Sequence, residues 1–87
     1  MKADKTKVNR LLKTARGQLD GILKMVEEDR YCIDISNQLM ATQAILHSAN
    51  KEIIHAHLQH CVLDALQEGN ADEKMEEIMA IIDKISK

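Results

Sequence analysis

Apolar residues in the first part of the chain recur at steps of three and four, which is the period of one helix face. Four charged residues at 27–30 interrupt this stripe, and the apolar pattern restarts at Ile33. The pattern predicts a long helix that opens near Asp4 and Lys5, then a short turn near Asp29 and a second, antiparallel helix. The first stripe contains Val8, Leu11 or Leu12, Ala15, Leu19, Ile22 and Val26.

The second helix is expected to be long, because residues 31–68 contain neither Gly nor Pro. Gly69 and Asn70 are expected to end it, since Gly is favoured just past a helix C-terminus. Asp72 is then in position to cap a third, short helix. The second stripe contains Ile35, Leu39, Ala44 or Ile45, Leu46, Ala49, Ile53, Ala56 and Leu63, and the third contains Met75, Ile78, Met79, Ile82 and Ile85.

Composition narrows the fold class. The chain has 87 residues, no Pro, three Gly and a single aromatic residue, Tyr31. A core that lacks large aromatic side chains buries little surface by itself, which favours oligomerisation. We therefore predict an all-α, three-helix protomer with one domain over residues 1–87, in which residues 1–4 are a flexible tail. The lengths of the first two helices suit a dimeric four-helix bundle made by two antiparallel hairpins.

Charge is distributed unevenly along the chain. The first 18 residues hold six cationic side chains and one anionic side chain, a net charge of +5, whereas the whole chain has a net charge of -2. Such segregation predicts either a solvated helix face or a basic surface that meets phosphates, and an oligomer would display several copies of it. No helix-turn-helix or zinc-finger pattern is visible. The apolar runs are too short for a membrane span and no leader is visible, so we expect a cytoplasmic protein.

Candidate metal ligands gather in residues 31–68, which hold both cysteines and all four histidines. His57 and Cys61 are four residues apart, so on a helix they share one face, one turn apart. Cys32 lies 29 residues before Cys61, which corresponds to roughly 43 Å along a continuous helix. Either the helix breaks, or Cys32 meets His57 and Cys61 of another, antiparallel chain. We adopt the second interpretation.

Two thiolates with one imidazole suit Cu(I) better than structural Zn(II), which takes four ligands. His55 and His60 point away from the pair on a helical projection, and His47 is assigned no role. The alternative is that both cysteines are ordinary buried residues. An enzyme is not expected, because no oxyanion-hole glycine motif accompanies the cysteine and histidine.

The chain resembles the copper-sensitive operon repressor family, whose branches respond to copper, nickel or cobalt, and formaldehyde. The matching stretches are RGQLDGI at 16–22, MVEEDRYCID at 25–34 and HLQHCV at 57–62. The pattern of Cys32 followed by His57 and Cys61 is similar to the Cu(I) signature of the family. The nickel/cobalt branch has a histidine at the final ligand position and the formaldehyde branch lacks that cysteine, whereas the persulfide-sensing branch lacks the histidine found here at His57.

The resemblance implies dimers with an antiparallel four-helix core that pair into tetramers. It implies Cu(I) bound between protomers by Cys32 of one chain and His57 with Cys61 of the other. Tyr31 and Glu77 occupy positions of partners to these ligands. The apo tetramer would bind operator DNA and repress copper-efflux genes, and copper would release it. The basic residues available for DNA are Lys5, Lys7, Arg10, Lys13, Arg16 and Lys51.

The chain departs from the family pattern at two usually basic positions, which are Leu11 and Ser48 here. Arg10, Lys13 and Lys51 lie near enough in the sequence to substitute. This departure leaves open a family member that binds copper without DNA affinity. A separate alternative, which depends on the two cysteines, is a persulfide or thiol-redox sensor that links Cys32 to Cys61 across protomers.

Overall fold

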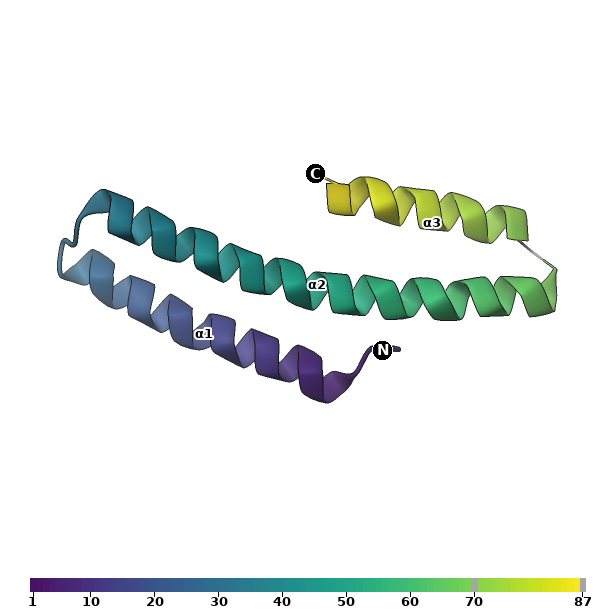
Figure 1. Ribbon diagram of the computed structural model, residues 1–87, viewed down its shortest axis with the longest axis horizontal. Helices are drawn as coiled ribbons and strands as arrows, with labels where there is room; N and C mark the ends of the chain where they lie inside the picture. The colour runs from purple at the N-terminus through teal and green to yellow at the C-terminus, as the bar shows by residue number, and fades with distance from the viewer. Residues whose placement is uncertain (70, 87) are drawn as a thin grey trace. The chain divides into compact units, whose positions relative to one another are not determined.

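The computed structural model describes the backbone of residues 1–69 and 71–86, without the side chains at 62, 65, 68, 71, 74, 85 and 86. Its helices are α1 (Lys5–Glu27), α2 (Cys32–Glu68) and α3 (Ala71–Ser86), and no strand occurs within this described part (Figure 1). The all-α, three-helix prediction is confirmed. Asn70 and the side chain of Ile85, which we expected at the end of α2 and in the third stripe, lie outside the described residues.

The chain divides into two compact units. The hairpin unit is Lys5–Asn50, and the C-terminal unit is Met1–Asp4 with Lys51–Lys87. Residues of α2 belong to both units, and α3 belongs to the C-terminal unit. A single domain with a flexible tail over residues 1–4 stays a prediction. None of the helices, over the described residues, has the length and apolarity that a bilayer crossing requires.

The turn between α1 and α2 is centred on Asp29, as predicted. Asp29 has a positive φ of 52°, a left-handed conformation in which Gly is usual and Asp is tolerated. The amide of Arg30 donates to the carbonyl of Met25 at 3.0 Å, and that of Asp29 to Val26 at 3.1 Å. These two bonds form a Schellman motif, which ends α1 without glycine. Tyr31 lies directly before α2 in the N-cap position, and its carbonyl accepts the amide of Ile35 at 3.2 Å.

Within the hairpin unit, α1 runs antiparallel to the first part of α2 (Figure 1). The buried residues of α1 are spaced by seven: Val8, Ala15 and Ile22. On α2, Thr42 and Ala49 are buried with the same spacing. The Thr42 hydroxyl lies 2.8 Å from Gln18 Oε1 and 3.1 Å from the Gln38 carbonyl oxygen. A narrow seam of this kind is what two helices bury when each meets one neighbour.

The predicted apolar stripes are wider than the core of one chain. On α1, Leu12, Leu19 and Val26 are 43%, 45% and 55% exposed. On α2, Ile35, Ile45, Ile53 and Ala56 are half-buried, whereas Leu39, Leu46 and Leu63 are exposed. No atom lies within 4 Å of a Cβ built on Gly17 or Gly21, so the described residues of this chain do not pack against these glycines.

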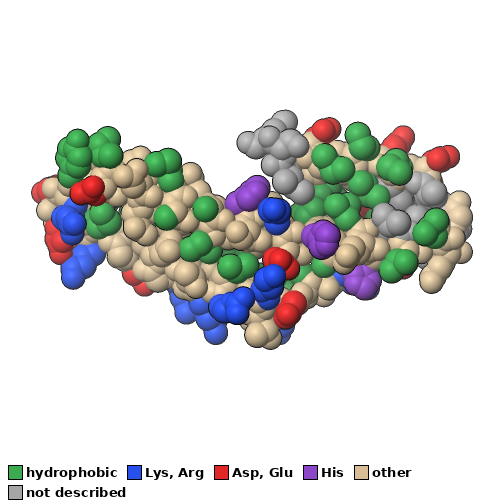
Figure 2. All heavy atoms as spheres, in the orientation of Figure 1, with side chains coloured by type: hydrophobic (Ala, Val, Ile, Leu, Met, Phe, Trp, Pro, Cys, Tyr) green, Lys and Arg blue, Asp and Glu red, His purple; other side chains and the backbone are tan. Residues whose placement is uncertain are grey.

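The junction before α3 agrees with the sequence in part. Gly69 directly follows α2 with a φ of 73°, as predicted for a glycine past a helix C-terminus. The expectation that Asp72 caps α3 is wrong, because α3 begins at Ala71 and Asp72 lies in its first turn. An acidic residue there still interacts favourably with the helix dipole. Figure 2 shows hydrophobic side chains over α3. The exposed apolar residues of this helix include Met75, Met79 and Ile82.

Candidate metal centre

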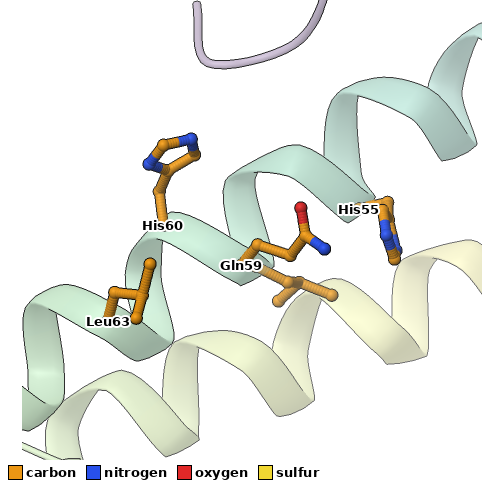
Figure 3. A pocket seen from close by; sticks show the side chains of 5 residues that line it. His55, Gln59, His60 and Leu63 are labelled. Carbon is orange, nitrogen blue, oxygen red and sulfur yellow. The ribbon is translucent and has the colours of Figure 1, made fainter.

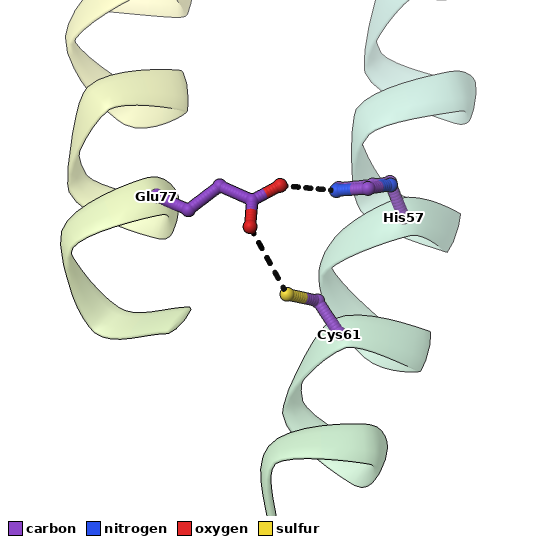
Figure 4. A group of neighbouring side chains, drawn as sticks. All are labelled: His57, Cys61 and Glu77. Atoms are coloured by element: carbon purple, nitrogen blue, oxygen red, sulfur yellow. Dashed lines mark hydrogen bonds and ion pairs between the residues drawn. The ribbon is translucent and has the colours of Figure 1, made fainter. Parts of the chain in front are cut away.

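The candidate site joins α2 and α3 within the C-terminal unit. His57 and Cys61 lie one helical turn apart on α2, and Glu77 approaches both from α3 (Figure 4). His57 Nε2 lies 3.1 Å from Glu77 Oε1, and Cys61 Sγ lies 4.0 Å from Glu77 Oε2. One possible ligand atom from each residue falls within 4.8 Å of the other two, and no other such group is found among the described residues.

The three side chains differ in exposure. Cys61 is 6% exposed, so its thiol faces the interior of the unit. The side chains of His57 and Glu77 are 44% and 43% exposed. The site is therefore enclosed on the side of the sulfur and open on the side of the imidazole. A ligand atom from outside the chain has access to that open side.

The contact with Glu77 assigns the tautomer of His57. An ionised carboxylate only accepts hydrogen bonds, so Nε2 carries the proton that is donated to Oε1. The lone pair of a neutral ring then resides on Nδ1, which is the form that binds a metal. The Cys61 thiol is a weak donor towards Oε2, and a metal would replace its proton.

The other predicted residues of the site are not in this cluster. Cys32 is the first residue of α2, belongs to the hairpin unit and is exposed. Tyr31, directly before it, is 67% exposed. Both cysteines are free thiols. The structure thus brings His57, Cys61 and Glu77 together and leaves Tyr31 and Cys32 outside this group, and the roles of all five residues in metal binding stay predictions.

The remaining histidines lie elsewhere. His55 and His60 line a shallow groove on α2 together with Leu58, Gln59 and Leu63 (Figure 3). This groove belongs to the C-terminal unit and does not include Cys61 or Glu77. His47 is an exposed residue of the hairpin unit.

The basic residues are exposed, and most of them are on α1. Figure 2 shows Lys and Arg side chains gathered over its N-terminal half. The two positions that are usually basic in the family carry no positive charge in this chain. Leu11 is half-buried, and the Ser48 hydroxyl donates to the Ala44 carbonyl at 3.1 Å. The predicted DNA-binding residues Lys5, Lys7, Arg10, Lys13 and Arg16 belong to the hairpin unit, and Lys51 is the first α2 residue of the C-terminal unit.

Comparison with known proteins places the chain in a family. A family model described as "Metal-sensitive transcriptional repressor" matches residues 4–84. The chain belongs to this family. A copper-sensing transcriptional repressor CsoR of Mycobacterium ulcerans is 44% identical over 68 residues, which are 78% of this chain and 58% of that protein. The CsoR of Bacillus subtilis is 36% identical over 84 residues, which are 97% of this chain and 83% of that protein.

Solved structures of family members share the fold. The copper-sensing repressor CsoR with Cu(I) from Geobacillus thermodenitrificans matches with a TM-score of 0.81 and 38% identity, over 94% of this chain and 85% of that chain. The nickel-responsive transcriptional regulator InrS matches with a TM-score of 0.85 and 25% identity, over 98% of this chain and 96% of that chain. Because proteins named for different metals match with similar TM-scores, the fold does not select the metal. Selectivity must come from the donor atoms.

Proposed function

We propose that this protein is a Cu(I)-responsive, DNA-binding transcriptional repressor that leaves its operator when copper binds. The observation that carries the proposal is the grouping of His57, Cys61 and Glu77 in a chain of the metal-sensitive repressor family. Copper-efflux genes are the expected targets, and the cytoplasm is the expected location. The chain covers 58% of the length of the M. ulcerans CsoR, and the longer B. subtilis match supports the same function.

The proposed ligands are His57 Nδ1 and Cys61 Sγ of one protomer with Cys32 Sγ of the partner subunit. The open side of His57 supports an external third ligand. The exposed thiol of Cys32 supports the same idea, because a residue at the start of α2 is available to an antiparallel partner. Two sulfurs and one imidazole nitrogen form a soft, three-coordinate set that suits Cu(I). The complete site therefore requires a homodimer, and dimers would pair into a homotetramer on DNA.

Glu77 is proposed to carry the signal from the metal to α3. Its carboxylate contacts both α2 ligands, so a change at either ligand alters the contacts of α3. It also holds His57 in the tautomer that exposes Nδ1, which is the usual role of a carboxylate behind a metal-binding imidazole. By linkage, DNA must weaken copper binding by the same factor by which copper weakens DNA binding.

An anaerobic Cu(I) titration against a competing chelator tests the ligand set. We expect one tightly bound ion per protomer, and we expect Cys32→Ser, His57→Ala and Cys61→Ser each to lose it. His55→Ala is the matched control, because it removes a nearby α2 imidazole outside the cluster. Tight copper binding that survives Cys32→Ser would contradict the intersubunit site.

A gel-shift assay with DNA from upstream of the gene tests the repressor role at a stated salt concentration. We expect the apo protein to bind and Cu(I) to release it. A chain that binds copper but shifts no DNA would fit the alternative of a family member without DNA affinity.

A thiol sensor is the second candidate, because both cysteines are free thiols and one of them is exposed. The His57→Ala variant separates the two functions. It should lose the copper response, whereas a sensor that links Cys32 to the partner's Cys61 keeps its response to polysulfide, which mass spectrometry detects.

A further inference from the structure

The exposed surface of α1 beside its buried seam carries two adjoining hollows. One is lined by Thr6, Asn9, Arg10, Lys13 and Thr14, and the other by Asn9, Leu12, Lys13 and Arg16. Asn9 and Lys13 line both hollows, one helical turn apart. At about 100° per residue, Asn9 projects roughly 100° from Val8 and 120° from Ala15, which face the core. Asn9 is thus an uncharged side chain at the centre of a cationic surface.

The neutral polar side chains of these hollows differ in what they can still bind. The Thr14 hydroxyl donates to the Arg10 carbonyl at 2.9 Å within the helix. Thr6 also has an interaction within the chain. The Asn9 amide has no hydrogen-bond partner among the described residues, and Asn9 is exposed. Asn9 is therefore the group whose acceptor and two donors remain available for a directional contact.

The surroundings of Asn9 match those of a base-reading residue. Arg10, Lys13 and Arg16 supply positive charge that suits phosphates, and phosphate contacts fix position without reading sequence. An asparagine amide pairs with the N6 and N7 edge of adenine in the major groove.

We propose that Asn9 determines DNA sequence specificity by binding the major-groove edge of an A·T base pair. This inference rests on the proposed function as a DNA-binding repressor and adds to it a residue that selects the sequence. An acidic protein partner would also bind these basic residues, but its binding would not require an amide at position 9. The uncharged amide releases no counterions from DNA, so its contribution is separable from that of its neighbours by salt dependence.

The test uses the full-length protein and DNA from upstream of its gene, with each base pair changed in turn. For the wild type we expect at least one A·T pair, repeated where symmetric copies of Asn9 reach the DNA, whose replacement weakens binding about fivefold or more. In Asn9→Ala, replacement of the same base pair should leave the DNA affinity almost unchanged. The dependence of affinity on salt should stay as in the wild type. Lys13→Ala is the matched control one turn away. It should weaken binding to every sequence alike and reduce the steepness of the salt dependence.

A probe with 7-deazaadenine at the chosen position sharpens the test, because it removes the N7 acceptor without changing base pairing. The wild type should bind this probe more weakly, and Asn9→Ala should bind both probes equally. The inference is overturned if wild-type protein binds DNA in a copper-sensitive manner while Asn9→Ala keeps every sequence preference. It is also overturned if Asn9→Ala changes the salt dependence as Lys13→Ala does. Absence of any wild-type binding to DNA would overturn the proposed function as well.

Discussion

Replacement of Glu77 by alanine should separate copper binding from copper response. Glu77 is the α3 residue that contacts both His57 and Cys61. In Glu77→Ala the two proposed α2 ligands remain, and so does the proposed third ligand, Cys32 of the partner subunit. We expect the variant to bind Cu(I) and DNA but to stay on DNA when copper is added, because the contact that reports the ligands to α3 is gone.

The magnitudes follow from the exposure of the pair. A buried hydrogen bond to a charged group contributes about 1.5–3 kcal/mol. The His57 and Glu77 side chains are 44% and 43% exposed, so solvent screening reduces the contribution to folding to about 0.2–1 kcal/mol. The thermal midpoint should therefore change little. Loss of a carboxylate behind a ligating histidine lowers metal affinity by about 10–100-fold, and half-exposure places the expected loss near tenfold.

The assay compares DNA affinity with and without saturating Cu(I) at constant salt. Allosteric coupling in proteins amounts to about 5–150-fold in affinity, and we expect the ratio to approach one in Glu77→Ala. Glu77→Gln should be intermediate, since an amide oxygen still accepts the Nε2 proton of His57 without the negative charge. Glu76→Ala is the control, because it removes the same charge from the neighbouring exposed position of α3, outside the cluster.

Two outcomes would refute this reasoning. The first is a Glu77→Ala variant that binds copper and still leaves DNA as the wild type does. The second is an equal loss of response in Glu76→Ala, which would indicate a general effect of charge on α3. Either result would remove Glu77 from the path between the metal site and DNA.

Three further predictions concern stability in urea at fixed protein concentration. Thr42→Val should lower the free energy of unfolding by about 1 kcal/mol, because the Thr42 side chain is buried and hydrogen-bonded to Gln18. Ser48→Ala should lower it little, and equal losses in the two variants would contradict this reasoning. Asp29→Gly should gain about 0.5–1 kcal/mol by relieving a φ of 52°, and a loss would show that the Asp29 side chain stabilises the turn. Gly17→Ala should raise the free energy of unfolding by about 1 kcal/mol if no second chain packs against Gly17. A lower free energy of unfolding would indicate that a second chain packs there.

Local sequence patterns predicted the helices and the pairing of His57 with Cys61, because both depend on the fixed period of a helix. The turn at Asp29 was predicted from the charged interruption, although its left-handed Asp was not, since Gly is the usual residue there. Glu77 was expected from family resemblance alone, because nothing in its local sequence separates it from other acids on α3. Asn9 went unnoticed, since a neutral side chain adds nothing to a charge pattern.

The width of the apolar stripes is the main point on which sequence and single-chain structure differ. A periodic apolar pattern indicates which helix faces are buried in the functional assembly, but it does not identify the element that packs against each face. Leu12, Leu19 and Val26 belong to the stripe of α1 but remain 43–55% exposed, because α1 meets one neighbour within the hairpin unit. The sequence therefore predicts the apolar faces correctly and overestimates the core of one chain.

The proposed dimer would account both for the exposed apolar faces and for the third ligand of the proposed metal site. A second protomer that covered the stripe of α1 would also bring an antiparallel α2, whose first residue is Cys32. The same association would bury Leu19 and supply the third donor beside His57. If copper binds only across this interface, it should stabilise the assembly, since a ligand stabilises the state that binds it. In this proposal the third ligand reaches the half-exposed side of His57 from a second protomer, so metal binding and subunit association would be thermodynamically coupled.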